Sequence, residues 1–350
     1  MARKRKEPDV TLPEEASGSD WLNAVRSQIE AEFGVGIMKS GQDIVDEPRM
    51  VIPFSPSFDE MLGGGVPEGS WVSMAGPEKC GKSVAALSFA AQCQMPEYGE
   101  RPVMILAPEH RTDGFLLSGI RGLRKDESHL IVIQSEKGRI LTSVDYFNIG
   151  LSFLKNVPGG VLLIDSVSAM LSPKVLQDGI ESADHGSSYQ LIGKFIDLAV
   201  PVVRCNRNIV FGIIQQYTNT RGYGGMVEKA AMKWKYQADI RVQCTKSEFL
   251  YDDGEDMPPT GQRQSWRCKK SALCGPGREV SGDIRFGVGI DTSRELLTRA
   301  AAQKLVSVNG SWYVLRGPGD EVIKVQGETA AVRLLDSRPD LVGVLRGGLR

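Results

Sequence analysis

The stretch GPEKCGKS at residues 76–83 decides the fold class of this 350-residue chain. It fits the pattern G-x-x-x-x-G-K-[ST], in which glycines let the backbone turn its N–H groups toward phosphate. An apolar strand pattern, WVSMAG at 71–76, leads into it, and a helical pattern, SVAALSFAAQC at 83–93, follows. Phosphate binding requires that strand–helix context, so the sequence predicts a nucleotide site here.

Continuous apolar runs indicate the rest of the core. PVMILA at 102–107, GVLLIDS at 160–166 and NIVFGII at 208–214 are typical of strands covered on both faces. Helical stretches at 144–157 and 189–205 alternate with these runs. The alternation predicts an α/β fold with a mostly parallel central sheet.

The composition and the hydrophobic pattern of the chain change near both ends. Residues 1–18 form a basic and polar tail that we expect to be disordered, and the nucleotide-binding core is expected to span 46–290. Residues 291–350, with the β pattern SWYVLRG, are expected to form a small α/β C-terminal domain.

An amphipathic helix and linker are expected over 19–45. Trp21, Val25, Ile29 and Phe33 recur every four residues and form one apolar stripe. The stripe must pack either on the chain's own core or on a neighbouring subunit, and spacing alone leaves both open. We interpret the segment as an oligomerisation helix.

The bulk composition excludes several classes of protein. The net charge is −1, so any binding to a polyanion must come from local patches. No apolar run approaches the roughly 18 residues of a membrane span, and no apolar leader follows the N-terminus. The six cysteines include no C-x-x-C pair, which predicts reduced, buried thiols of a cytoplasmic protein, and the three scattered histidines argue against zinc.

Carboxylates follow two of the predicted strands. Asp165 ends the run VLLID, where it could hold the water shell of Mg²⁺, although a strand-end Asp can also simply cap a turn. Glu109, in ILAPEH, lies just beyond another strand and is a candidate base for water activation; a solvated loop residue is the alternative.

The strand IVFGII ends in Gln215 and Gln216, and an amide there could sense the outermost phosphate of a nucleotide. The next segment, YTNTRGYGGMVEKAAMKWK at 217–235, mixes basic, aromatic and glycine residues. Basic residues follow a phosphate backbone and aromatic ones stack on bases, so this is a candidate nucleic-acid grip. A flexible surface loop is the alternative.

Several segments together resemble the RecA family of recombinases. They are QIEAEFGVGIMKSGQD (28–43), FDEMLGGGVPEGSWVSMAGPEKCGKS (58–83), LLIDSVSAML (162–171) and FGVGI (286–290) followed by KLVSVNGSWYVLRG (304–317). The resemblance covers roughly residues 20–340 in the same order. It implies a RecA-like P-loop ATPase core with ATP and Mg²⁺ as cofactors.

The resemblance implies a role for each matching residue around the nucleotide. Glu109 would activate the attacking water, Gln216 would sense the γ-phosphate, and Ser83 with Asp165 would hold Mg²⁺. Lys269 and Lys270, in WRCKKS, fall where the family places lysines that reach a neighbour's γ-phosphate. The expected cofactor-binding residues are Gly76, Pro77, Glu78, Lys79, Cys80, Gly81, Lys82, Ser83, Val84, Asp113 beside the adenine and Phe286 stacked near it.

The resemblance also places two DNA loops. The first falls within DGIESADHGSS (178–188), which contains His185. The second supplies the remaining expected DNA contacts, which are Arg221, Tyr223, Met226, Lys229 and Lys233. Leu116 stands where a second adenine-stacking aromatic is expected, and no acidic tail ends the chain. These departures suggest a divergent member, such as a phage-encoded relative of UvsX.

The resemblance therefore implies an ATP-dependent homologous recombinase that forms helical filaments on single-stranded DNA. It would pair that strand with double-stranded DNA and exchange strands in recombination and repair, hydrolysing ATP to ADP and phosphate. Expected partners are further copies of itself and a single-strand-binding or mediator protein, in the bacterial nucleoid or a phage host's cytoplasm, with no membrane. The alternatives are a ring helicase or RadA/KaiC-like ATPase, and a regulatory ATP-binding module that has lost strand exchange.

Overall fold

The computed structural model describes residues 18–170, 173, 187–218, 226–228, 232–252 and 256–349. The chain divides into two compact units, Met1–Arg49 and Met50–Arg350. In the first, α1 (Gly18–Phe33) is the amphipathic helix expected from the sequence, and α2 (Gly41–Asp46) begins at a capping box between Ser40 and Asp43. The oligomerisation role of α1 stays a prediction.

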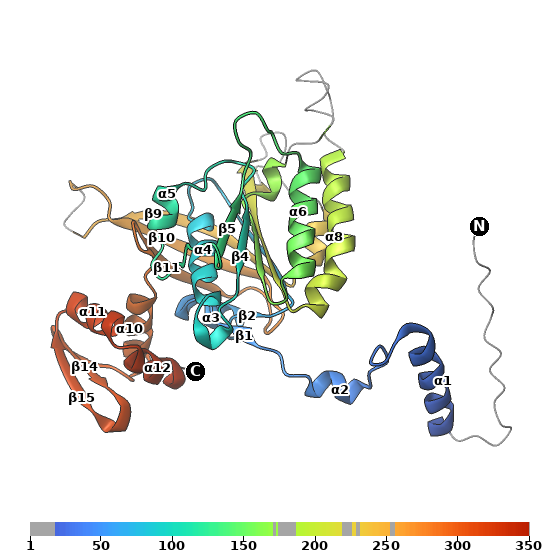
Figure 1. Cartoon of the computed structure of the whole chain (residues 1–350). Coiled ribbons are helices and arrows are strands. Elements are labelled where there is room, and N and C mark those ends of the chain that lie inside the picture. The colour runs from blue at the N-terminus through green and yellow to red at the C-terminus, as the bar shows by residue number, and fades with distance from the viewer. Residues whose placement is uncertain are drawn as a thin grey trace. The chain divides into compact units, whose positions relative to one another are not determined.

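The second unit is built on one large sheet (Figure 1). Within the described residues, the strand order is β12-β11-β10-β9-β3-β7-β6-β4-β5, with β8 beside β7. The strands that run parallel to one another are β3 (Trp71–Gly76), β4 (Val103–Leu106), β5 (Leu130–Ile133), β6 (Val161–Ile164), β7 (Ile209–Thr218) and β9 (Ile240–Leu250). The antiparallel ones are β8 (Met226–Glu228), β10 (Gly261–Lys270), β11 (Glu279–Arg285) and β12 (Gly289–Ile290).

Helices cover both faces of this sheet (Figure 1). Those on one face are α3 (Pro56–Leu62) and α4 (Lys82–Cys93), near the short pair β1 (Val51–Ile52) and β2 (Val66–Pro67), whereas α6 (Ser143–Asn156), α8 (Ser187–Cys205) and α9 (Met232–Gln237) cover the other. Alternate residues of β3 enter the two cores: Val72 and Met74 pack on the α4 side, and Trp71 and Ala75 on the α6 side.

The predicted strands and helices of the core are confirmed. The runs at 71–76, 102–107, 160–166 and 208–214 are β3, β4, β6 and β7, and the stretches at 144–157 and 189–205 are α6 and α8. The sequence interpretation did not include β5 or the antiparallel extension from β9 through β12. The prediction of a mostly parallel central sheet is confirmed: β5, β4, β6, β7, β3 and β9 pair in parallel, and within the described residues β8 and the extension from β10 through β12 pair antiparallel.

The C-terminal elements have a core of their own. They are α10 (Thr292–Ala302), β13 (Ser307–Asn309), β14 (Trp312–Arg316), β15 (Val322–Gln326), α11 (Glu328–Ser337) and α12 (Pro339–Gly348). Leu296, Leu315, Leu335 and Leu341 are buried together among them. SWYVLRG forms β14, as expected.

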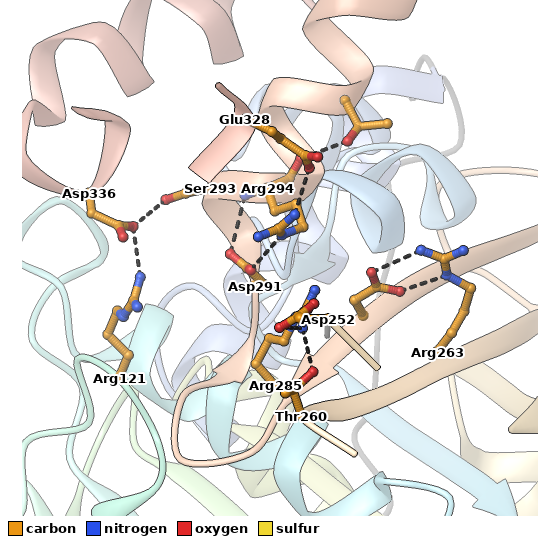
Figure 2. A network of polar contacts seen from close by, with 12 residues as sticks. Arg121, Asp252, Thr260, Arg263, Arg285, Asp291, Ser293, Arg294, Glu328 and Asp336 are labelled. Carbon is orange, nitrogen blue, oxygen red and sulfur yellow. Dashed lines mark hydrogen bonds and ion pairs between the residues drawn. The ribbon is translucent and has the colours of Figure 1, made fainter. Parts of the chain in front are cut away.

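A polar network links these C-terminal elements to the main sheet (Figure 2). The Asp336 carboxylate accepts hydrogen bonds from Arg121 Nη1 and Ser293 Oγ, each at 2.7 Å. Arg294 donates to Asp291 at the start of α10 and to Glu328 at the start of α11. Since Arg121 belongs to the loop after α5 (Gly114–Ser118), the network joins the small module to the core beside α5.

The cysteines are free thiols, as the sequence predicts, but they are not uniformly buried. Cys80, Cys93, Cys244 and Cys268 are buried, Cys274 is half-buried, and Cys205 is exposed. Cys205 is exposed because it is the last residue of α8, where the helix leaves the sheet. The expectation of buried thiols is wrong for that residue.

Candidate functional site

The loop at 77–81 joins β3 to α4 and contains residues with left-handed backbone angles. Gly81 precedes α4 with φ of 77°, and Lys79 also has a positive φ of 57°. No side chain caps the N-terminus of α4, so its first N–H groups face the loop without a side-chain acceptor. An anion is favoured there by those N–H groups and by the positive end of the helix dipole.

Lys82 is buried within this loop. Its Nζ donates to the carbonyl oxygen of Gly76 at 3.0 Å and to that of Pro77, and it lies 3.6 Å from Cys80 Sγ. Only 7% of the residue is exposed. The ammonium group is therefore held inside the turn by neutral acceptors, which a phosphate oxygen could replace.

Ser83 and Asp165 come together next to Lys82. Asp165 directly follows β6, and its carboxylate accepts a hydrogen bond from the Ser83 side chain. Burial raises the pKa of Asp165, Glu109 raises it further, and the Ser83 hydrogen bond and Lys82 lower it. A hydroxyl and a carboxylate are ligands that Mg²⁺ accepts together with phosphate oxygens. The two residues thus fit the ion expected from the sequence.

Glu109 lies beyond the end of β4, facing Asp165. Its Oε1 accepts hydrogen bonds from Ser166 Oγ and from Gln215 Nε2, the latter at 2.8 Å, and Arg111 Nη1 lies 3.3 Å from Oε2. The carboxylate is mostly buried, whereas the Arg111 side chain is 66% exposed. Its hydrogen bonds hold Glu109 at the edge of the sheet where a phosphate chain would end.

The two glutamines at the end of β7 point in opposite directions, because side chains alternate along a strand. Gln215 reaches Glu109, whereas Gln216 accepts a hydrogen bond from Gln243 at 3.4 Å. The sequence interpretation assigned the sensor to Gln216 and assigned no contact to Gln215. The structure thus brings Gln215 into the group around Glu109 and leaves Gln216 on the other face of the strand.

One cavity of about 680 Å³ contains most of the predicted nucleotide residues. Asp113 lines it, capping α5 by accepting from the Leu116 backbone N–H at 2.8 Å, and Phe286 lines it with half of its side chain exposed. Phe115, which the sequence interpretation did not select, also lines this cavity and is 87% exposed. The other lining residues from the sequence prediction are Glu78, Lys79, Cys80, Gly81, Lys82, Ser83, Val84, Glu109 and Asp165.

A second cavity, of about 530 Å³, brings together Gln216 and Lys269. Glu228, Lys235 and Arg241 also line it, and Glu228 pairs with Arg241 at 3.0 Å and Lys235 at 3.4 Å. Lys270 is not among the residues that line this cavity.

Lys270 binds the end of a helix. Its Nζ donates to the carbonyl oxygens of Tyr236, at 3.3 Å, and Ala238, at 2.5 Å, where α9 ends. The adjacent lysines Lys269 and Lys270, which the sequence interpretation treated alike, therefore have different surroundings.

Most of the predicted DNA contacts lie outside the described residues, namely His185, Arg221, Tyr223 and Lys229. The backbone of Met226 starts β8, opposite Thr218. Lys233 is described, and its Nζ pairs with Asp197 of α8 at 2.5 Å, with both side chains about half exposed.

The parallel sheet and the glycine loop between β3 and α4 define an α/β protein of the phosphate-loop class. The model of the RecA N-terminal domain matches residues 20–291. The chain therefore belongs to the RecA family.

Curated relatives match along nearly the whole chain. Protein RecA of Treponema denticola is 28% identical, covering 100% of this chain and 81% of that protein. Protein RecA of Mannheimia haemolytica is 28% identical, covering 100% and 92%, and that of Oleidesulfovibrio alaskensis 26%, covering 87% and 84%. Across the described segments, none of the helices has the length and apolar character needed to span a membrane.

Proposed function

We propose that this chain is a DNA-dependent ATPase that assembles on single-stranded DNA and catalyses homologous pairing and strand exchange in the cytoplasm. The observation that carries the proposal is the Glu109 carboxylate, which Gln215 holds at 2.8 Å inside the cavity that Lys82 and Ser83 also line. A positioned carboxylate facing a phosphate loop supports hydrolysis rather than binding alone.

ATP is the substrate that this cavity fits. Lys82 and the N–H groups of the loop would hold the phosphates, while Asp113, Phe115 and Phe286 would contact the base and sugar. Ser83 and Asp165 would hold Mg²⁺, which neutralises charge on the phosphate oxygens when bound. Glu109 would accept a proton from the attacking water, and Arg111 would stabilise charge at the same edge.

The DNA response would start at β7. Gln215 contacts Glu109 in the ATP cavity, and the adjacent Gln216 contacts Gln243 and lines the cavity with Lys269. A displacement of the strand end would move both glutamines and Thr218, after which a DNA loop is expected. Of the two lysines expected to reach a neighbour's nucleotide, we propose Lys269, because the Nζ of Lys270 is already bound to carbonyls of α9.

The test is DNA binding measured by fluorescence anisotropy on a labelled oligonucleotide, with and without ATP. Wild-type protein should bind only with ATP, and log affinity should fall steeply with log salt because lysines and arginines displace counterions. The Lys82→Ala variant should bind DNA weakly both with and without ATP. Lys137→Ala, at an exposed position outside the cavity, should behave as wild type.

Two outcomes would contradict this function. Equal DNA binding with and without ATP would mean that the nucleotide does not control DNA affinity. ATP hydrolysis without any salt-dependent DNA binding would instead favour the regulatory module. A strand-exchange assay between a circular single strand and a linear duplex then tests the recombinase activity itself.

A further inference from the structure

Two cysteine side chains lie against Gly76 at the base of the phosphate loop. Cys80 belongs to the loop and Cys244 to β9, and they are 1% and 3% exposed. Ala75 of β3 pairs with Gln243 of β9 in parallel register, so Gly76 and Cys244, one residue further along each strand, lie beside each other. A Cβ on Gly76 would lie 2.7 Å from Cys80 Sγ and 2.8 Å from Cys244 Cβ. The two side chains therefore share the space that the missing side chain leaves.

Different surroundings give the two thiols different roles. Cys80 lies beside Cys244, and this contact, followed by the nearby Lys82 ammonium, lowers the pKa of Cys80. The same contact and burial raise the pKa of Cys244, whose Sγ lies 3.5 Å from both the backbone oxygen of Lys246 and Gln264 Oε1. Cys80 is thus the thiolate-forming partner and Cys244 the one that keeps its proton.

Cys80 belongs to the wall of a cavity although little of it is exposed. It is one of the residues that line the cavity of about 680 Å³, and Lys82 Nζ lies 3.6 Å from its sulfur. A cation beside the sulfur of a cysteine in a cavity wall is a setting of oxidation-sensitive cysteines.

We propose that Cys80 and Cys244 form an oxidation site at which small hydroperoxides convert the thiol pair to a disulfide. The Cys80 thiolate attacks the peroxide, the O–O bond breaks, and Cys80 becomes a sulfenic acid while one water leaves. Cys244 then gives up its proton as its sulfur attacks the Cys80 sulfur, an S–S bond forms, and the hydroxyl takes that proton and leaves as a second water. Two thiols and one hydrogen peroxide thus give one disulfide and two waters.

Oxidation would change the phosphate loop directly. An S–S bond is about 2.05 Å, shorter than any contact between two unbonded sulfur atoms, so it would draw Cys80 and the loop that carries it toward β9. If the cavity binds ATP as proposed above, the distorted loop should bind it more weakly, and a reductant should restore the affinity.

The experiment uses the full chain treated with hydrogen peroxide, blocked with an alkylating reagent and digested without reductant for mass spectrometry. A cross-linked peptide pair containing Cys80 and Cys244 should appear and should vanish with dithiothreitol. Cys244→Ser should leave Cys80 as sulfenic or sulfinic acid. Cys205→Ser, at an exposed position away from the loop, should keep the cross-link. Oxidation of Cys205 or Cys274 while Cys80 stays alkylated would overturn the proposal.

The same samples separate this proposal from the proposed function. Binding of a fluorescent ATP analogue should fall about tenfold or more on oxidation and return on reduction. If the reduced chain binds no nucleotide, the ATPase function fails, while the cross-link still decides the oxidation site. A complete cross-link with unchanged nucleotide affinity would overturn the effect on the loop.

Discussion

At the scale of single residues, the site depends on side chains that touch across strand ends. Lys82 is held by the loop's own carbonyls, Ser83 by Asp165, and Glu109 by Gln215. The contacts of Ser83 and Glu109 join residues from different strands or loops, whereas those of Lys82 lie within one loop. A change at one position therefore acts through a named neighbour.

Glu109→Gln should slow ATP hydrolysis by about 10²-fold or more, since an amide cannot accept the proton from water. Nucleotide affinity should stay within a few-fold, because the amide oxygen still accepts from Gln215 and Ser166. Steady-state hydrolysis and binding of a fluorescent ATP analogue measure the two separately. Unchanged hydrolysis would remove Glu109 from its proposed role.

Gly76→Ala should destabilise the chain by about 1–3 kcal/mol, because the added methyl overlaps Cys80 and Cys244. Gly275→Ala is the matched control, since nothing lies within 4 Å of its added Cβ. Urea unfolding of both variants measures the difference. Equal stability would show that the loop can shift without cost.

The sequence predicts those site residues whose signal is local. Lys82 and Ser83 follow from the loop motif, and Asp165 and Glu109 from apolar runs that end at a carboxylate. The hydrogen bond between Gln215 and Glu109 could not be predicted from the sequence. To choose between two adjacent glutamines, one must know which face of β7 each side chain occupies and where the loop after β4 lies. Ser166 and Phe115 belong to no sequence motif that would have marked them as site residues.

At the scale of elements, α10 packs on α3 through a buried carboxyl group. Glu295 Oε2 accepts from Ser55 Oγ at 2.8 Å and from the Ser57 backbone N–H at 3.1 Å. Among the described residues, Oε1 has no hydrogen-bond partner, and burial raises the pKa of Glu295 to about 7. Asp59 on α3 has its pKa raised to about 7 by the same cause.

These shifts give stability a definite pH dependence. The folded pKa of Glu295 exceeds the unfolded value of 4.5, so the folded state holds the proton more tightly. The stabilisation is complete below pH 4.5 and is lost as the pH rises to about 7, by at most roughly 3 kcal/mol. Glu295→Gln should flatten this slope in part, and adding Asp59→Asn should flatten it further. Unfolding free energies across that pH range measure the slope; an unaltered slope would contradict the assignment.

The sequence predicts helices and parallel strands better than the antiparallel ones. β3, β4, β6 and β7 are buried on both faces and read as continuous apolar runs. β10 alternates buried and exposed residues and carries four charged side chains in GQRQSWRCKK, so no apolar run marks it. Its pairing with β9 also contains register shifts, which composition does not predict.

At the scale of the whole molecule, a net charge of −1 means that the proposed DNA binding and assembly must depend on local groups. Lys269 lines a cavity with Gln216, whereas the ammonium group of Lys270 donates a hydrogen bond to the Ala238 carbonyl oxygen at the end of α9. The resemblance made both candidates for contact with a neighbour's nucleotide, and only side-chain placement distinguishes them.

Lys269→Ala should abolish ATP-dependent assembly while leaving the unfolding free energy within about 0.5 kcal/mol, because its side chain is exposed. Lys270→Ala should instead lower stability by about 1 kcal/mol through loss of its bonds to α9 and should still assemble. Light scattering with single-stranded DNA and urea unfolding measure both properties. The reverse pattern would assign the bridging role to Lys270.

We propose that ATP in the Lys82 cavity is required for assembly on DNA. Electron microscopy of the chain with single-stranded DNA, with and without a non-hydrolysable ATP analogue, measures this requirement. Continuous helical filaments are expected with the analogue, and bare DNA is expected both without it and with the Lys82→Ala variant. Closed rings with the analogue, or filaments that form equally well without it, would show that ATP does not act in this way.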